Sequence, residues 1–178
     1  ANIDKAIKKG TGDLPGVKYE NYIYEGYGPS GVAIMMEVMT DNKNRTASNI
    51  RTIFQKAGGN LGTQGSASHN FTQVGIIKID KKEISEERIL ELAIEAGADE
   101  CKSSLDFHEI QCPMNEIYNV KRELEKEISN FISTEIEWIP LSRVNVPKEK
   151  NEDLINFFMS LEEDDDVQNV YSNVEFKN

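Results

Sequence analysis

The chain has 178 residues, with 31 Asp and Glu against 20 Lys and Arg, which gives a formal net charge of −11 and an isoelectric point near 4.7. Its 38% hydrophobic and 29% charged residues are typical of a globular protein, and no apolar run approaches the roughly 20 residues that span a bilayer. The composition therefore excludes a disordered chain and a transmembrane one, and the overall acidity argues against a generic nucleic-acid coat.

The apolar pattern divides the chain into alternating strands and helices. Strands are predicted from alternation or from apolar runs, and helices from apolar residues three and four apart that lie between a capping residue and a glycine. In chain order the pattern predicts the end of a helix at 1–9, strands at 19–24 and 32–40, a helix at 44–57, a strand pair or one bent strand at 66–71 and 74–80, a helix at 86–96, a strand at 105–112, a helix at 117–128, a strand at 135–139, a helix at 154–161 and a strand at 170–176. This order indicates a mixed α and β fold.

The predicted helix at 44–57 has one apolar face and one polar face that is turned away from it. The polar face is formed by Arg45, Asn49, Thr52 and Lys56. Lys43, Arg45 and Thr46 stand at the helix start, where exposed backbone N–H groups and cations favour phosphate contacts. A capped surface helix has the same pattern, so both interpretations stay open.

A glycine-rich motif precedes this region. Gly26-Tyr27-Gly28-Pro29-Ser30-Gly31 matches the letter spacing of a dinucleotide-binding loop. Such a loop must open a helix whose N-terminus faces the pyrophosphate, but here a strand follows. We interpret the motif as a tight turn between strands in which glycine supplies a positive φ, with Tyr27 at an exposed tip where it can touch a partner.

No pattern indicates a metal site or catalysis, and we expect no cofactor. The carboxylates from Asp164 to Glu175 partly match EF-hand spacing, but Asn169 stands where that loop needs glycine. His108 is a candidate partner for a carboxylate, with no nucleophile predicted beside it. The remaining candidate ligands are too scattered for a zinc site: Cys101, Cys112, His69 and His108. Two cysteines cannot build a disulfide framework, so we expect a cytoplasmic protein.

The charge is unevenly distributed along the chain. Residues 1–79 carry nine Lys and Arg against six Asp and Glu, whereas residues 80–140 carry seven against sixteen and residues 141–178 carry four against nine. A polyanion would therefore meet the first segment, and a basic protein partner would meet the acidic middle one. Ordinary surface variation would give the same asymmetry, so charge alone does not show whether either segment binds a partner.

Several stretches resemble the YebC/PmpR family. They are residues 24–33 (YEGYGPSGVA), 40–46 (TDNKNRT), 58–62 (GGNLG) and 165–173 (DDVQNVYSN), with residues 2–12 similar to the junction after that family's N-terminal helical domain. Ser30 departs from the pattern, because the family usually has glycine there. The resemblance implies an α+β fold of two α/β sandwich domains, the second ferredoxin-like and inserted into the first. Residues 1–9 would end the helical domain, 10–65 with 141–178 would form the discontinuous domain, and 66–140 would form the insert.

The resemblance also implies a function. Members of the family are described as probable transcriptional regulators that bind DNA, and relatives are ribosome-associated factors that ease translation through proline-rich stretches, or mitochondrial translational activators. We therefore expect a non-enzymatic regulator that binds DNA or, alternatively, ribosomal RNA. Lys43→Glu combined with Arg45→Glu should weaken that binding, and affinity should fall with salt. The candidate contacts, chosen by charge and position, are Lys8, Lys9, Lys43, Arg45, Arg51 and Lys56, with Tyr27 as a stacking residue.

Two other classes of function stay open at this stage. One is a protein-interaction module whose acidic insert docks a basic partner. The other is an enzyme or small-molecule binder built on the insert, which would need a deep pocket with convergent polar groups.

Overall fold

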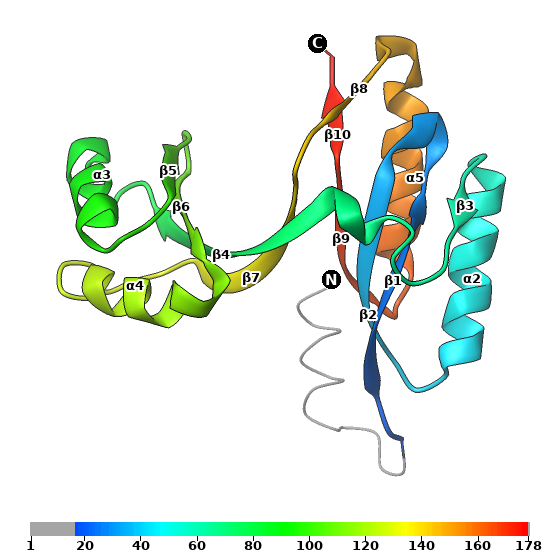
Figure 1. The fold of residues 1–178 in the computed structure, drawn as a ribbon, viewed down its shortest axis with the longest axis horizontal. Coiled ribbons are helices and arrows are strands. Elements are labelled where there is room, and N and C mark those ends of the chain that lie inside the picture. The colour runs from blue at the N-terminus through cyan, green and yellow to red at the C-terminus, as the bar shows by residue number, and fades with distance from the viewer. Residues whose placement is uncertain (1–16, 178) are drawn as a thin grey trace. The chain divides into compact units, whose positions relative to one another are not determined.

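A computed structural model describes residues 17–177, so the expected helix end at residues 1–9 lies outside the described residues. The chain forms two compact units (Figure 1). The first contains the residues up to Thr72 together with those from Pro140 onward, and the second runs from Gln73 to Ile139. Within the described part of the chain, no helix is both long enough and apolar enough to cross a membrane.

The first unit combines a four-stranded sheet, a separate strand pair and two helices. The sheet has the order β3-β1-β2-β9 with antiparallel neighbours, and β8 pairs in parallel with β10. The elements are β1 (Glu20–Tyr27), β2 (Ala33–Thr40), α2 (Lys43–Lys56), β3 (Asn60–Leu61), β8 (Val144–Val146), α5 (Asn151–Glu163), β9 (Val167–Ser172) and β10 (Val174–Phe176). The sheet therefore joins strands from both ends of the chain.

Both helices of the first unit pack on the same face of the sheet. Ile34 and Met36 of β2 share a buried core with Phe54 of α2 and with Phe157 and Leu161 of α5. The Phe54 and Phe157 rings meet edge to face with their centroids 5.0 Å apart. Each such buried side chain contributes about 1.5–3 kcal/mol of burial free energy, so this face holds the unit together.

The glycine-rich motif connects β1 to β2, and the turn interpretation is confirmed. A short 3-10 turn, Pro29–Gly31, joins the two antiparallel strands, and Ser30 and Gly31 have φ values of 63° and 75°. Ser30 thus occupies a left-handed conformation that glycine adopts with less strain. The prediction for Tyr27 was wrong in one respect: it lies within β1, and the turn residues form the tip.

A second glycine motif fits against the first. The Cβ that an alanine at position 59 would carry falls 2.4 Å from the carbonyl oxygen of Tyr27 and 2.9 Å from the Cα of Gly28. Only glycine leaves room for that approach, which lets β3 pair with the end of β1. The two glycine-rich stretches therefore serve one local packing arrangement.

The second unit is ferredoxin-like, as expected. Its elements are β4 (Phe71–Asp80), α3 (Glu86–Glu95), β5 (Glu100–Ser103), β6 (Phe107–Pro113), α4 (Ile117–Leu124) and β7 (Ser133–Pro140), in the sheet order β5-β6-β4-β7. This βαββαβ sequence of elements defines the ferredoxin-like motif. Its core joins Ile77 and Ile110 of the sheet to Ile89 of α3 and Val120 of α4.

The structure corrects the sequence-based elements at several places. Residues 66–70 do not form a strand, because the buried carboxylate of Glu25 accepts the N–H groups of Ala67 (2.9 Å) and Ser68 (3.1 Å) and holds this segment in turns. Strand β5 was not predicted, because its sequence ECKS is short and mostly polar. Strands β3 and β8 were not predicted either, because they have only two and three residues. The single strand predicted at 170–176 is two strands, β9 and β10, which belong to different sheets.

Candidate nucleic-acid interface

Helix α2 begins at a buried polar network centred on Asp166. The Asn42 side chain caps the helix by accepting the backbone N–H of Arg45 at 3.1 Å. The hydroxyl oxygen of Thr46 lies 2.7 Å from Oδ2 of Asp166 and 2.7 Å from the hydroxyl oxygen of Thr40. Because Asp166 is only 6% exposed, these contacts fasten the end of β2 and the start of α2 to the segment before β9.

Arg45 belongs to the same network. Its guanidinium donates to Asp41 Oδ1 at 2.8 Å and to Asp166 Oδ2 at 3.3 Å. The hydrogen bond to Asp41, followed by the one to Asp166, raises the pKa of Arg45. Asp164 and Asp165 line the same hollow, so the start of α2 is surrounded by carboxylates. This arrangement favours a structural role for Arg45 and disfavours phosphate at the helix start.

Lys43 and Arg51 lie on a different side of α2, beside two tyrosines of β1. The Lys43 ammonium stands over the Tyr22 ring, 5.1 Å from its centroid, and the Tyr24 hydroxyl donates to the Lys43 carbonyl oxygen at 3.3 Å. Arg51 is exposed and interacts electrostatically with Tyr24. We call Tyr22, Tyr24, Lys43 and Arg51 the tyrosine–cation cluster. It combines aromatic faces with cations, which single-stranded nucleic acids require of a binding surface.

Burial of Tyr24 and a hydrogen bond at Tyr22 raise the pKa values of both phenols in the tyrosine–cation cluster. Burial raises the pKa of Tyr24, and the positive charge of Arg51 partly offsets this by lowering it. The 2.5 Å hydrogen bond to Glu20 raises the pKa of Tyr22. That hydrogen bond and Lys18, 3.4 Å away, lower the pKa of Glu20. Glu20 is therefore ionised and already partnered, while Lys43 and Arg51 supply the cluster's own positive charge.

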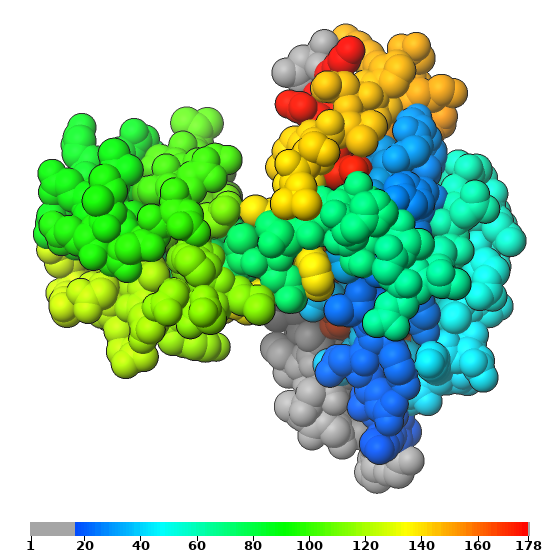
Figure 2. All heavy atoms as spheres, in the orientation of Figure 1, coloured from blue at the N-terminus to red at the C-terminus, as the bar shows by residue number. Residues whose placement is uncertain are grey.

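The structure separates the other predicted contacts. Tyr27 lies on the opposite face of the sheet from Tyr24, where its hydroxyl donates to the Ser66 carbonyl at 2.9 Å and accepts from Asn70 at 3.2 Å. Lys56 ends α2 on the side that faces α5. Lys8 and Lys9 lie outside the described residues. Figure 2 shows the segment that contains α2, in cyan, at the surface of the first unit.

Sequence analysis missed Tyr22 and Tyr24. The available signal was their spacing of two within a strand, which places both rings on one face. The helical positions carried a similar signal, since residues 43 and 51 project about 80° apart around α2 while 45 and 56 project to another side. The two periodicities group each pair on its own element, but they do not show that α2 packs beside β1, so the tyrosine–cation cluster could not be assembled from them.

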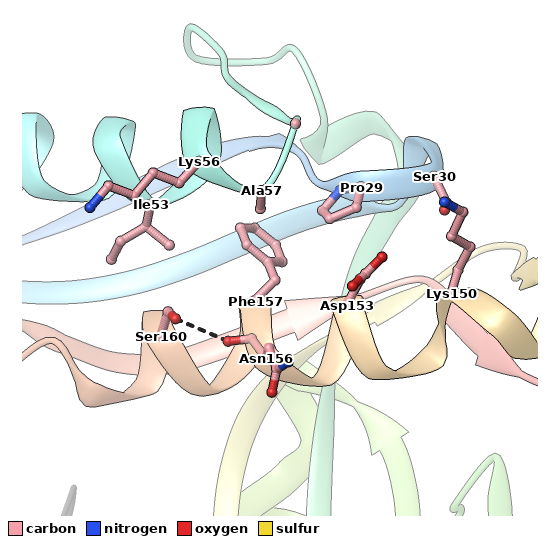
Figure 3. A pocket seen from close by; sticks show the side chains of 11 residues that line it. Pro29, Ser30, Ile53, Lys56, Ala57, Lys150, Asp153, Asn156, Phe157 and Ser160 are labelled. Atoms are coloured by element: carbon pink, nitrogen blue, oxygen red, sulfur yellow. Dashed lines mark hydrogen bonds between the residues drawn. The ribbon is translucent and has the colours of Figure 1, made fainter.

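A groove runs between α2 and α5, with a volume of about 730 Å³ (Figure 3). Lys56 and Lys150 stand at its opposite ends, with Asp153 on α5 next to Lys150 and Asn156 further along α5 beside Ser160. Pro29 of the glycine-rich turn and Phe157 contribute an apolar floor. All of these residues belong to the first unit.

His108 has a partner that the sequence analysis did not anticipate. Its Nδ1 lies 2.6 Å from the hydroxyl oxygen of Ser103, and its Nε2 lies 2.8 Å from the carbonyl oxygen of Ile84. Since a carbonyl can only accept, Nε2 carries the proton and Nδ1 accepts the serine hydroxyl. His108 is fully buried, and the three groups join β5, β6 and the segment before α3. We interpret this chain as a structural bridge of the insert.

The chain matches a family model described as the TACO1/YebC second and third domain over residues 19–174. A probable transcriptional regulatory protein of Pelagibacter ubique is 66% identical over 177 residues, which cover 99% of this chain and 73% of the relative. One from Persephonella marina is 47% identical over 176 residues, which cover 98% of this chain and 70% of the relative.

A solved structure is similar over the same extent. The crystal structure of a conserved hypothetical protein from Aquifex aeolicus superposes with a TM-score of 0.86 at 44% sequence identity. The alignment covers 99% of this chain and 73% of that one. The sequence and structural comparisons thus agree along nearly the whole chain.

Proposed function

This chain belongs to the TACO1/YebC family, and from that premise we propose that it regulates gene expression by binding nucleic acid, with DNA as the leading target. Its relatives are named probable transcriptional regulatory proteins, which supports the regulatory class. The observation that carries the binding proposal is the tyrosine–cation cluster. There Lys43 and Arg51 contact phosphates, and Tyr22 and Tyr24 offer aromatic faces to bases.

The contacts in this proposal position the nucleic acid and do not read a base sequence. The cations lie on the side of α2, and its start is occupied by the Asp166 network, so the helix does not present the residues of a recognition helix to a groove. A base stacked on Tyr22 would take the place of the Lys43 ammonium, which then reaches the adjoining phosphate. Affinity would therefore depend on salt more than on sequence.

The test is the double variant Lys43→Ala, Arg51→Ala. It should weaken binding about a hundredfold, because two charge-assisted contacts are lost. On duplex DNA it should also reduce the slope of log affinity against log salt by about 0.9 for each lost phosphate contact. Fluorescence anisotropy at several salt concentrations measures both quantities. The pair Lys43 and Arg45 is less suitable, because Arg45→Glu would also disturb Asp166.

A matched control removes two cations from the insert, Lys82 and Lys102, which are both exposed. Lys82→Ala with Lys102→Ala changes the net charge equally and should leave affinity and salt slope within twofold of the parent. Equal losses in the two double variants would mean that net charge, and not the tyrosine–cation cluster, determines binding.

The alternative target is the ribosome, with the chain acting as a translation factor that eases synthesis through proline-rich stretches. Positioning contacts to phosphates would serve ribosomal RNA as well as DNA. Crosslinking the full-length protein in cells and sequencing the attached nucleic acid separates the two: promoter DNA supports the leading proposal, and ribosomal RNA supports the alternative. Loss of the crosslinks in the Lys43→Ala, Arg51→Ala variant would tie either target to the cluster.

A second candidate function is docking of a basic protein on the insert. Leu90 and Ile94, 49% and 68% exposed, lie one turn apart on α3 among the exposed carboxylates of Glu87, Glu91 and Glu95. An apolar pair surrounded by acids suits a partner with Lys and Arg around apolar residues. A pull-down that survives nuclease and is lost in Leu90→Ser, Ile94→Ser would favour it. The matched control is the similarly exposed pair on α5: Ile155→Ser, Met159→Ser.

A further inference from the structure

We propose that the groove between α2 and α5 binds a nucleoside phosphate unit, either as one unpaired nucleotide of a strand or as a free nucleotide. The strand form rests on the proposed function and adds to it a preference for single strands. The free form does not depend on that function. The two forms share one chemistry, which is a flat base with phosphate beside it.

The floor of the groove is rigid and apolar. Phe157 is held edge to face by Phe54, and Gly28 lies so close to it that a Cβ there would fall 2.7 Å from Phe157 Cε2. Pro29 and Ile53 line the groove beside it. The volume of about 730 Å³ lies within the roughly 300–1,000 Å³ of small-molecule sites. A base can therefore pack on a surface that already exists.

The ends of the groove carry positive charge. Lys56 closes α2 at one end, and Lys150 precedes α5 at the other (Figure 3). Among the interactions of residues 17–177, neither ammonium has an ion pair, so each can approach a phosphate without breaking one. A nucleotide within a strand has a phosphate on either side of its base, which matches one cation at each end.

The middle of the groove suits a base edge. Asp153 lies between the two lysines on the side of Lys150, with Ser30 close to that end, and Asn156 lines the groove further along α5. A carboxylate repels phosphate but accepts a hydrogen bond from the amino group of a base, and a side-chain amide can both donate and accept hydrogen bonds. This order of charges, cation–carboxylate–cation, places the phosphates at the ends and the base between them. A paired base could not present its edge here, so duplex is excluded from the groove.

The test fills the groove without touching its buried floor. Ser160 is exposed and lines the groove, so Ser160→Trp should block it, whereas Met159→Trp adds the same side chain on a neighbouring exposed position outside the lining. The probes are a short labelled single-stranded DNA, the corresponding DNA duplex and adenosine monophosphate. We expect Ser160→Trp to weaken single-strand binding about tenfold and to leave duplex binding unchanged, and Met159→Trp to change neither.

A second variant tests the ends of the groove. Lys56→Ala with Lys150→Ala should reduce the salt slope for the single strand by about 0.7 for each lysine. Unchanged single-strand affinity in Ser160→Trp overturns the strand form, even where Lys43→Ala, Arg51→Ala confirms the tyrosine–cation cluster. If the parent chain binds neither oligonucleotide, the proposed function fails, and adenosine monophosphate decides the free form: binding that Ser160→Trp removes supports it, and absence of binding refutes it.

Discussion

The two units hold themselves together over different distances along the chain. In the discontinuous unit, the buried contacts that join its parts link residues 120 or more apart, such as Asp166 with Thr46 and Asn173 with the backbone of Ala33. In the insert, the corresponding buried bridge from His108 reaches only to Ser103 and Ile84, 5 and 24 residues away. Long-range closure costs more chain entropy, so the discontinuous unit depends on a few specific polar contacts where its parts meet.

The largest effect should follow from removing Asp166. Asp166→Ala takes away one acceptor of buried Thr46 and one partner of Arg45, and we expect the free energy of unfolding of the first unit to fall by about 3 kcal/mol. Trp138 is the only tryptophan of the chain and belongs to the insert. The urea midpoint measured by circular dichroism should therefore fall, while the midpoint measured by Trp138 fluorescence should fall much less. Equal shifts in the two signals would mean that the units unfold as one and would break the comparison.

A matched variant separates the lost acceptor from the lost charge. Asp166→Asn keeps an oxygen that can accept from Thr46 but removes the ion pair with Arg45, whose side chain is 48% exposed. Because that pair is partly solvated, the loss should be smaller than in Asp166→Ala. Identical losses would show that the charge of Asp166, and not its hydrogen bonds, holds the two parts of the unit together.

The elements that sequence analysis predicted are those with a local pattern. The apolar run of β2, the stripe of α5 and the alternation in β7 each identify an element from residues that are neighbours along the chain. The turns at 66–70 were missed because their cause, the carboxylate of Glu25, is more than 40 residues away. The inserted ferredoxin-like arrangement was predicted only from the resemblance to a family, because periodicity does not reveal strand order.

The candidate site was less predictable than the fold, for a related reason. Positive charge identified Lys43, Arg45, Arg51 and Lys56 equally well, but charge does not tell what each side chain faces. Asp166, which engages Arg45, lies 121 residues further along, and the tyrosines that distinguish Lys43 and Arg51 come from another strand. Tyr27 was chosen from a motif. It is three residues from Tyr24 in the same strand, and because successive side chains alternate, this odd spacing places it on the opposite face from Tyr22 and Tyr24.

A pair of glycine variants sharpens the comparison at an intermediate size of effect. In the first unit, a Cβ at position 59 would fall 2.4 Å from a backbone oxygen, whereas in the insert a Cβ at position 75 would meet the side chains of Cys112 and Ile117 at 2.9 Å. The overlap at position 59 is deeper and involves backbone atoms alone, whereas at position 75 the Cys112 thiol can rotate away and only the Ile117 Cβ moves with its backbone. We therefore expect Gly59→Ala to cost about 2 kcal/mol and Gly75→Ala about 1 kcal/mol. Urea unfolding measures both losses. A larger cost for Gly75→Ala would show that the insert has the less adjustable packing.

The smallest effect concerns a surface ion pair of the insert and depends on pH. Arg88 donates to Glu127, with Nε 2.9 Å from Oε2, and this hydrogen bond lowers the pKa of Glu127 from its ordinary value of 4.5. A carboxyl with a lowered pKa contributes stability above its unfolded pKa and loses that contribution as pH falls through its folded pKa. Arg88→Met should therefore reduce the insert's stability slightly at neutral pH, and the difference from the parent should disappear once the pH falls below the lowered pKa of Glu127.

Carbon-detected NMR titration of Glu127 provides the direct measurement of this last effect. Its midpoint should rise toward 4.5 in Arg88→Met and stay low in Lys126→Met, a control that removes an exposed cation paired with Glu123 on the same unit. Trp138 fluorescence in urea at neutral and acid pH then reports whether the shift is expressed as stability of the insert. An unmoved midpoint in Arg88→Met would show that the pair does not persist in solution. The insert would then depend mainly on its core and the His108 bridge, which would widen its contrast with a first unit that depends on Asp166.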